Sequence, residues 1–200
     1  MCLACNDIGR ERVGMRRFVF RSPWLGFLAC DPALAAPAAA FYRRNRKAFA
    51  PFDPIQPEEF FTPEGQEERL TWDLEQAEAG RSFRFLLVQP RHPGKIIGLA
   101  GLNEIVRGAF QSCFISYKLD HTLWGQGYGA EAIAALTEWG FRNLGLHRVE
   151  ANIMPRNLPS RRAAAKAGFE EEGLARRYLK INGVWEDHIH MVRRNDEEGL

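Results

Sequence analysis

The stretch that decides the fold is Leu123-Trp-Gly-Gln-Gly-Tyr-Gly-Ala-Glu131, which places three glycines at alternate positions. Gly125, Gly127 and Gly129 let the backbone turn tightly and direct several N–H groups to one side. The sequence predicts a strand before this stretch and a helix from about Ala130, so the positive end of that helix faces the same side. Because this arrangement suits phosphate oxygens, the loop predicts a ligand that carries a diphosphate.

Two known phosphate-binding loops can be compared with this stretch. A P-loop needs Lys and then Ser or Thr after its last glycine, whereas Ala130 follows here, which excludes it. The dinucleotide fingerprint G-x-G-x-x-[GA] does match at Gly125, Gly127 and Ala130, and Glu150 follows about twenty residues later. However, residues 120–124 separate the predicted strand from the first glycine, and the motif lies past the middle of the chain. Both features count against the dinucleotide hypothesis. It makes its own prediction, which is that NAD(P) raises the melting temperature of the protein.

Composition limits the class of protein. Two hundred residues with 46% hydrophobic content make one domain with a sizeable core. A formal net charge of +2 argues against a dedicated nucleic-acid-binding protein, which would carry a strong basic excess. Of the four cysteines, Cys2 and Cys5 have metal-ligand spacing, but no second Cys or His pair completes a zinc site. We therefore expect no metal and free thiols, as in a cytosolic protein.

The N-terminus allows two interpretations. Arg16-Arg17 followed by apolar residues imitates a signal peptide, but Arg21-Ser-Pro23 interrupts an apolar run that should extend for about 7–15 residues. No segment reaches the roughly 18 apolar residues of a membrane span. We therefore expect a cytoplasmic protein with no direct membrane or nucleic-acid partner. The expected boundaries are a disordered tail at 1–14, a single domain at 15–194 and a C-terminal tail at 195–200.

Residue patterns predict a mixed α/β sheet. Alternating apolar residues indicate strands, and helical spacing with caps such as Thr62-Pro63 indicates helices. Pro37 is a weak point of the first helix, and Pro23 makes the first strand irregular. Asn182-Gly183 predicts a C-terminal hairpin, which is foreign to a dinucleotide-binding fold. The expected strands cover residues 19–29, 83–89, 95–106, 113–119, 148–153, 178–181 and 184–192, and the expected helices cover 32–49, 63–79, 130–144 and 159–167.

Segments outside the glycine loop carry a resemblance to a known family. They are Phe41-Tyr-Arg-Arg-Asn45, Pro51-Phe-Asp-Pro54, Arg107-Gly-Ala-Phe110, His147-Arg-Val-Glu-Ala151, Asn157-Leu-Pro-Ser160, Lys166-Ala-Gly-Phe169 and Asn182-Gly-Val-Trp-Glu-Asp-His188. Over residues 25–192 and in one register, the chain resembles the GNAT N-acetyltransferases, in their RimJ/RimL-like branch of ribosomal-protein N-terminal alanine acetyltransferases. Gly127 and Gly129 also fit that family's acyl-CoA loop, [QR]-x-x-G-x-[GA], although Trp124 stands where Gln or Arg is usual.

The resemblance implies the GNAT fold, in which helices flank a central mixed sheet that ends in a hairpin, and acetyl-CoA as cosubstrate. Backbone N–H groups near Lys118 and Leu119 would polarise the thioester carbonyl. Asn157 would orient the pantetheine arm, although it can equally cap the helix that follows. The residues of the loop that would bind the diphosphate are Trp124, Gly125, Gln126, Gly127, Tyr128 and Gly129, where Trp124 can instead be a packing residue.

Ser160 matches the serine that RimL-like enzymes place near the sulfur of the cosubstrate. The resemblance therefore implies that Ser160 protonates the departing thiolate, whereas a serine at a helix start is otherwise an N-cap. Arg107-Gly108 and residues 41–45 are candidates for the acceptor groove. The basic residues there would guide a protein tail, or they form only a solvated helix face.

The general base has no such match. RimL-like enzymes use a Glu where this chain has an apolar stretch near Leu179. Glu104 at a strand end and Glu150 on the strand opposite the loop are the catalytic candidates, and each can instead pair with a nearby Arg. Asp187 and His188 beside the hairpin are further candidates.

Together these features predict an acetyl-CoA-dependent N-acetyltransferase that acts by direct transfer in a ternary complex. The resemblance implies the N-terminal α-amine of a protein as acceptor, with a ribosomal protein as the candidate that the RimJ/RimL-like branch suggests. At pH 7 an α-amine with a pKa of about 7.7–8 is neutral in roughly one molecule in ten, whereas a lysine amine is neutral in well under one in a thousand. A weak general base is therefore sufficient to deprotonate an α-amine. The alternatives are acetylation of a small amine, such as a polyamine or a drug, and a non-catalytic acyl-CoA-binding module.

Overall fold

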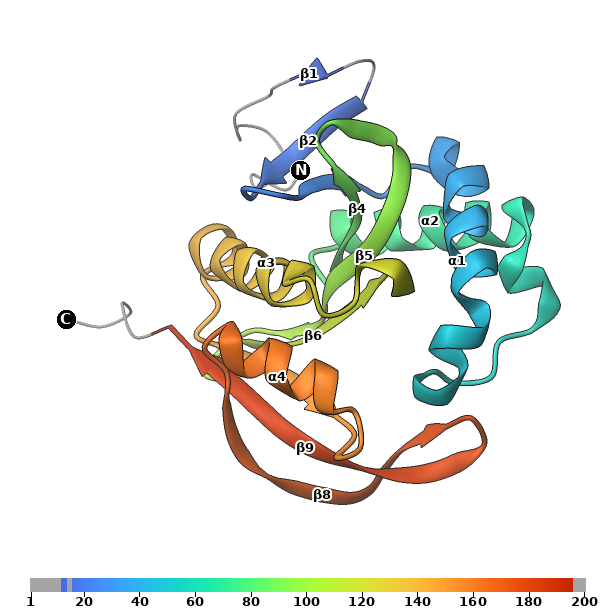
Figure 1. The fold of residues 1–200 in the computed structure, drawn as a ribbon. Coiled ribbons are helices and arrows are strands. Elements are labelled where there is room, and N and C mark those ends of the chain that lie inside the picture. The colour runs from blue at the N-terminus through green and yellow to red at the C-terminus, as the bar shows by residue number, and fades with distance from the viewer. Residues whose placement is uncertain (1–11, 14–15, 196–200) are drawn as a thin grey trace.

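The computed structural model describes residues 12–13 and 16–195. Within these residues the chain forms one nine-stranded sheet in the order β1-β2-β3-β4-β5-β6-β7-β9-β8 (Figure 1). Neighbouring strands are antiparallel throughout, except that β6 and β7 are parallel. The strands are β1 (Arg12–Val13), β2 (Arg16–Arg21), β3 (Gly26–Ala29), β4 (Phe83–Gln89), β5 (His92–Val106), β6 (Ser112–Leu119), β7 (Arg148–Ile153), β8 (Glu170–Ile181) and β9 (Val184–Arg194).

Helices cover both faces of the sheet, and each face has its own hydrophobic core. One core packs the sheet against α3 and α4, and the other packs it against α1 and α2 (Figure 1). β4 supplies both cores, because Phe85 and Leu87 face α3 whereas Leu86 and Val88 face α1 and α2. The helices are α1 (Ala35–Phe49), α2 (Pro63–Glu78), α3 (Tyr128–Leu144) and α4 (Leu158–Lys166).

The N-terminal part differs from the expected single strand at 19–29. The structure has two strands there, β2 and β3, which pair antiparallel around a turn closed by the hydrogen bond from Ser22 N to Leu25 O at 2.9 Å. Pro23 lies in this turn, where it needs no ladder hydrogen bond. Residues 32–34 form a 3₁₀ turn, so α1 begins at Ala35 and Pro37 lies in its first turn, where the missing N–H has no cost.

The C-terminal hairpin is present, and Asn182 and Gly183 both have positive φ, 46° and 82°, as its tight turn requires. β8 begins at Glu170, well before the expected start at 178. The sequence pattern missed this first part of the strand because its residues are mostly exposed and do not alternate between apolar and polar. Within the stretch expected as a tail, Arg12 and Val13 form β1; the rest of residues 1–14, Cys2 and Cys5 included, lies outside the described residues.

Residues 12–13 and 16–195 contain no helix that is both long and apolar enough to cross a membrane. The same part of the chain brings together no group of three His, Cys, Asp or Glu side chains that could hold a metal ion. Cys30 and Cys113 are free thiols in the core, and burial raises the pKa of each to about 12.

Candidate active site

The site lies where the central sheet opens. β6 and β7 pair over only three residues, Ser112 to Phe114 of β6 with Arg148 to Glu150 of β7, and then the two strands separate. A cavity of about 630 Å³ fills the gap. Residues 115–119 of β6 line one wall, residues 151–154 line the other, and the glycine loop and the start of α4 close one side. The early end of strand pairing therefore creates a ligand-sized space inside the sheet.

The wall formed by β6 offers unpaired backbone donors. Asp120 N donates to Ile97 O of β5 at 2.8 Å, so by the alternation of an antiparallel ladder the N–H groups of Leu119 and Tyr117 face β7 and the gap. The indole N–H of Trp124 donates a hydrogen bond to the carbonyl oxygen of Leu119 at 2.9 Å. By the same alternation the N–H of Lys118 faces β5, so of the two amides predicted near Lys118 and Leu119 only that of Leu119 faces the gap. The amides at 117 and 119 can donate to a carbonyl oxygen placed between the strands, and this role stays a prediction.

The glycine loop ends at the N-terminus of α3. Gly127 is the N-cap residue with a φ of 94°, a left-handed conformation that favours glycine. The first intrahelical bond runs from Glu131 N to Gly127 O at 3.1 Å, so the N–H groups of Tyr128, Gly129 and Ala130 precede it and have no acceptor within the helix. Three free amides and the helix dipole at the edge of the cavity fit a diphosphate.

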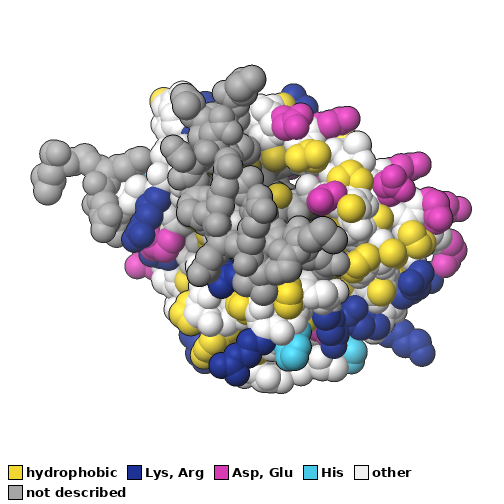
Figure 2. All heavy atoms as spheres, turned by 90° about the horizontal axis from the view of Figure 1, so that it is seen from above, with side chains coloured by type: hydrophobic (Ala, Val, Ile, Leu, Met, Phe, Trp, Pro, Cys, Tyr) yellow, Lys and Arg dark blue, Asp and Glu magenta, His cyan; other side chains and the backbone are white. Residues whose placement is uncertain are grey.

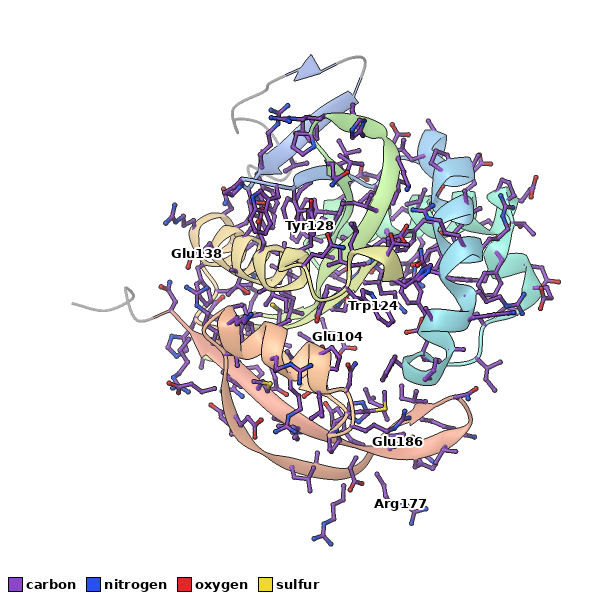
Figure 3. All side chains as sticks on the ribbon, viewed as in Figure 1. Glu104, Trp124, Tyr128, Glu138, Arg177 and Glu186 are labelled. Carbon is purple, nitrogen blue, oxygen red and sulfur yellow. The ribbon has the colours of Figure 1, made fainter. Side chains whose placement is uncertain are left out.

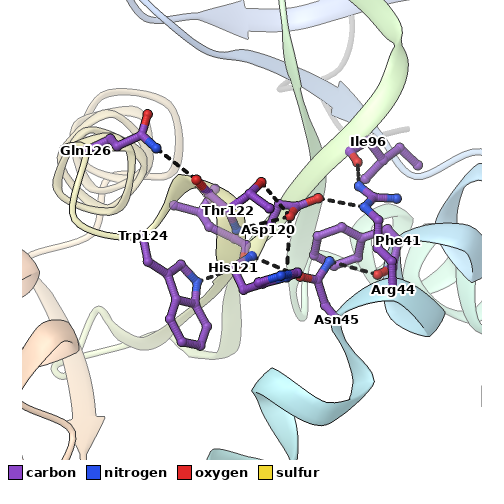
Figure 4. Close-up of polar contacts among 10 residues, drawn as sticks. Phe41, Arg44, Asn45, Ile96, Asp120, His121, Thr122, Trp124 and Gln126 are labelled. Atoms are coloured by element: carbon purple, nitrogen blue, oxygen red, sulfur yellow. Dashed lines mark hydrogen bonds and ion pairs between the residues drawn. The ribbon is translucent and has the colours of Figure 1, made fainter.

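A polar network fixes the segment that leads into the loop (Figure 4). The Asp120 carboxylate accepts hydrogen bonds from Thr122 Oγ1 at 2.9 Å and from Arg44 Nε of α1 at 2.6 Å. Burial raises the pKa of Asp120, but these hydrogen bonds outweigh it and lower the pKa overall. Asn45, also on α1, accepts from the backbone N–H of His121 at 2.9 Å. Helix α1 thus holds the loop in place.

The aromatic and amide side chains of the loop have different positions. Trp124 lines the cavity, and its ring centroid lies 6.5 Å from that of Phe49. Tyr128 lies on the β4 side of the loop, where its hydroxyl accepts from Gln89 Nε2 at 2.9 Å (Figure 3). Gln126 Nε2 donates to the carbonyl of Thr122 at 2.8 Å. The side chains of Gln126 and Tyr128 do not line the cavity, whereas Lys118, Leu119, Trp124, Gly125, Gly127, Gly129, Asn157 and Ser160 do.

The start of α4 brings Ser160 into the cavity. Asn157 is the N-cap of this helix, and its Oδ1 accepts from Ser160 N at 3.3 Å. The Ser160 hydroxyl is therefore not used as a cap, and it accepts from the hydroxyl of Tyr117 at 3.1 Å. Burial raises the pKa of Tyr117, which keeps its hydroxyl protonated. Ser160 thus has a fixed donor on one side, and its own proton remains available to the cavity.

Two cations on α4 also reach the cavity and were missed in the sequence. Arg162 and Lys166 line it together with Pro159, and both have exposed side chains. The spacing of 159, 162 and 166 places them on one face of the helix, and this is the signal that could have revealed them. Their charge suits the phosphate groups of a coenzyme A.

The opposite face of the splayed strands is polar. Lys118 forms a salt bridge with Asp53, and burial lowers the pKa of the lysine although Asp53 opposes that shift. Asn152 of β7 donates to the hydroxyl of Tyr178 at 3.4 Å, while its Oδ1 is buried and has no hydrogen-bond partner among the described residues. His188 of β9 completes this wall. A polar acceptor such as an amine would meet hydrogen-bonding groups here.

The two carboxylate candidates lie outside the cavity lining. Glu150 accepts from Arg148 Nη2 at 2.8 Å and lies 2.5 Å from His190 Nδ1. Burial raises the pKa of Glu150, but these two partners outweigh it and lower the pKa overall. Glu104 is exposed on β5 and has a positive φ of 52°. The Arg pairing that the sequence allowed is therefore observed for Glu150, and a base role for either residue stays a prediction.

The other predicted acceptor segments lie elsewhere. Arg107 donates to the backbone carbonyl of Leu144 and so joins the β5–β6 turn to the end of α3. On α1, Arg44 and Asn45 anchor the loop, and Arg46 pairs with Glu58. Figure 2 shows basic and acidic side chains gathered in separate groups at the end of the molecule formed by α1 and α2. These segments shape the surroundings of the cavity without lining it.

Known proteins resemble this chain in sequence and in fold. Residues 30–170 match the family described as acetyltransferase (GNAT) domain. A probable N-acetyltransferase, YjcK of Bacillus subtilis, is 41% identical over 156 residues, which cover 77% of this chain and 86% of that protein. The [ribosomal protein uS5]-alanine N-acetyltransferase of Escherichia coli is 36% identical over 151 residues, 76% of this chain and 77% of that protein.

Two solved structures share the fold. The ribosomal-protein-S5-alanine acetyltransferase of Vibrio fischeri is 34% identical and superposes with a TM-score of 0.84, covering 90% of this chain and 98% of that chain. Mycobacterium smegmatis RimJ in complex with a CoA-disulfide is 25% identical with a TM-score of 0.83, covering 98% of this chain and 91% of that chain. A coenzyme A derivative is thus bound in a protein of the same fold.

Proposed function

This chain belongs to the GNAT acetyltransferase family, and on that premise we propose that it transfers the acetyl group of acetyl-CoA to the N-terminal α-amine of a protein. Acetyl-CoA is the cosubstrate of the family, and the free amides of α3, the unpaired amides of β6 and the cations of α4 fit its diphosphate, its thioester and its phosphates. The observation that carries the proposal is the gap between β6 and β7, which joins these groups to a polar acceptor wall.

The acceptor part of the proposal is a ribosomal protein that begins with alanine. Two similar proteins support this acceptor, because the Escherichia coli relative and the Vibrio fischeri structure are both named as alanine acetyltransferases of ribosomal protein S5. The chemistry agrees, because an α-amine with a pKa of about 7.7–8 loses its proton far more readily at pH 7 than a lysine amine does. A cytoplasmic location is part of this proposal, since a ribosomal protein would be met there.

In the proposed reaction the protein mainly positions and polarises the reactants. The amine nitrogen attacks the thioester carbon while the amides of Tyr117 and Leu119 donate to the carbonyl oxygen, where negative charge develops. The C–S bond then breaks, and the Ser160 hydroxyl supplies a proton to the sulfur. Tyr117 donates to Ser160 Oγ at 3.1 Å and so stabilises the serine oxygen as it gives up its proton.

Mass spectrometry of the products tests this function. The purified protein is incubated with acetyl-CoA and, separately, with a peptide that begins with Ala, with its N-terminally blocked twin that contains Lys, and with a mixture of polyamines. The proposal expects acetylation of the free Ala terminus alone. Modification of the polyamines would identify a small-amine enzyme instead, and the absence of any product while acetyl-CoA still binds would favour a non-catalytic acyl-CoA-binding module.

A further inference from the structure

One titratable side chain of the acceptor wall has no role in the reaction described so far. His188 lies on β9, is 3% exposed and lines the cavity. The adjacent pair in the ladder joins His190 to Asn152 of β7, and residues two apart on a strand share a face, so His188 lies on the same face as Asn152. His188 is therefore a buried imidazole on the wall that an acceptor amine would contact.

The hydrogen bonding of His188 defines which ring nitrogen carries the proton. Nδ1 lies 3.1 Å from the backbone carbonyl oxygen of Glu186. A carbonyl oxygen can only accept, so Nδ1 carries the proton and donates it, and Nε2 of the neutral ring has a free lone pair. Among the described residues Nε2 has no hydrogen-bond partner. The ring is thus oriented by its backbone partner and keeps one basic nitrogen available.

The surroundings keep this imidazole neutral. Burial lowers the pKa of His188, and His190 lowers it further, while the hydrogen bond and charge of Glu186 and the charge of Asp187 only partly offset these effects. Both carboxylates have other partners, because Glu186 accepts from Arg156 and Asp187 accepts from the backbone of β8. From β8, the ring of Tyr178 lies 5.7 Å from His188, and its pKa is raised, so it faces His188 as a neutral phenol.

The carboxylates are less suited to accept a proton from the amine. Glu150 accepts hydrogen bonds from Arg148 and His190, which lower its pKa, and Glu104 is exposed. Neither side chain lines the cavity, whereas His188 does. The pKa of a neutral imidazole also lies closer to the pKa of an α-amine than does the lowered pKa of the Glu150 carboxylate.

We propose that His188 Nε2 is the general base of the acetyl transfer, accepting a proton from the acceptor amine directly or through one water molecule. The inference rests on the proposed function, since it requires an amine substrate. Of the three protons of the protonated amine, one passes to Nε2 and then to solvent, one remains on the amide nitrogen, and one ends on the sulfur of coenzyme A through Ser160. The new C–N bond replaces the C–S bond, so atoms and charges balance.

The experiment compares wild type with His188→Asn over pH 6 to 9, using the best amine from the product assay. Asn retains an N–H that can donate to Glu186 O but has no basic nitrogen. His92→Asn, at an exposed histidine at the start of β5, is the matched control and is expected to retain wild-type activity. At pH 6.5 we expect kcat/KM of His188→Asn to fall by about 10²-fold or more, with the affinity for acetyl-CoA within twofold.

The pH dependence separates a base from a structural role. Above the amine pKa of about 7.7–8 the solution itself supplies neutral amine, so the deficit of His188→Asn should shrink by pH 9. An activity within threefold of wild type at pH 6.5, or an equal loss at all pH values, would overturn the base role and leave the proposed function intact. A wild type that acetylates no amine would refute both.

A second measurement needs no variant and so does not depend on the folding of one. Nitrogen-15 NMR of the wild-type histidines should show that His188 is protonated at Nδ1 and unprotonated at Nε2 at pH 7. The pKa of His188 should lie below that of a free histidine. The opposite tautomer, or a doubly protonated ring at pH 7, would overturn the proposal.

Discussion

Replacement of Gly129 by Ala should weaken acetyl-CoA binding without weakening the fold. Gly129 is the second residue of α3, and an added Cβ would lie 3.3 Å from the ring of Tyr117 and 3.6 Å from Ala163 Cβ. Alanine gains up to about 1 kcal/mol of helix propensity. The displaced Tyr117 would strain its hydrogen bond to Ser160, which is worth about 1 kcal/mol. These terms nearly cancel, so the melting temperature should stay within about 2–4 °C of wild type.

Binding should respond differently, because the new methyl group stands on the cavity wall beside the amides expected to bind the diphosphate. We expect at least a tenfold loss of acetyl-CoA affinity, about 1.4 kcal/mol, in isothermal titration calorimetry. Gly145→Ala is the control at the other end of the same helix, where φ is 58° and no atom lies within 4 Å of the added Cβ. It should lose about 1–2 kcal/mol of stability and keep its affinity. Unchanged affinity in Gly129→Ala would refute the placement of the diphosphate at this helix.

Three further predictions concern the remaining site residues. Ser160→Ala should lower kcat by about 10²-fold and Tyr117→Phe by about tenfold, with little change in acetyl-CoA binding, and wild-type rates would contradict the proton route to sulfur. Asn157→Ala should cost about 1 kcal/mol in thermal unfolding through the lost cap, and Asn157→Ser should restore it. Because the pKa of Glu150 is lowered in the folded protein, its stabilising contribution is present above its unfolded pKa, about 4.3, and is lost as the pH falls through the folded value. Acid unfolding should therefore depend less on pH in Glu150→Gln than in wild type.

Local chemistry made much of the fold predictable. Thr62-Pro63 opens α2 as expected, and Thr62 Oγ1 accepts from Gly65 N at 3.1 Å. Asn182-Gly183 turns the hairpin as expected. The separation of β2 from β3 was not predicted, because the turn at Ser22 is stabilised by contacts from far along the chain: Glu131 of α3 accepts from both Ser22 Oγ and Trp24 N. No pattern within residues 19–29 contains that information.

The side of the site built from consecutive residues was the easier one to predict, although His188 of the acceptor wall was also a candidate from the sequence. The glycine loop and the Asn157–Ser160 segment could be identified because neighbouring positions carry their chemistry. The acceptor wall is different, since Asp53, Asn152 and His188 come from three distant segments that meet only in the folded sheet. The tautomer of His188 depends on a backbone carbonyl two residues away, which becomes its partner only in the geometry of β9.

The parting of β6 from β7 also has a consequence for how the molecule avoids self-association. Where two strands separate, each exposes backbone groups that could recruit a strand from another chain. Here those groups face inward, across a gap that α3 and α4 cover on one side of the sheet. The indole of Trp124 covers the carbonyl of Leu119, and the charge of Lys118 beside it opposes the entry of an apolar strand. The fold thus keeps an incomplete β-sheet open to one elongated ligand while discouraging aggregation through that opening.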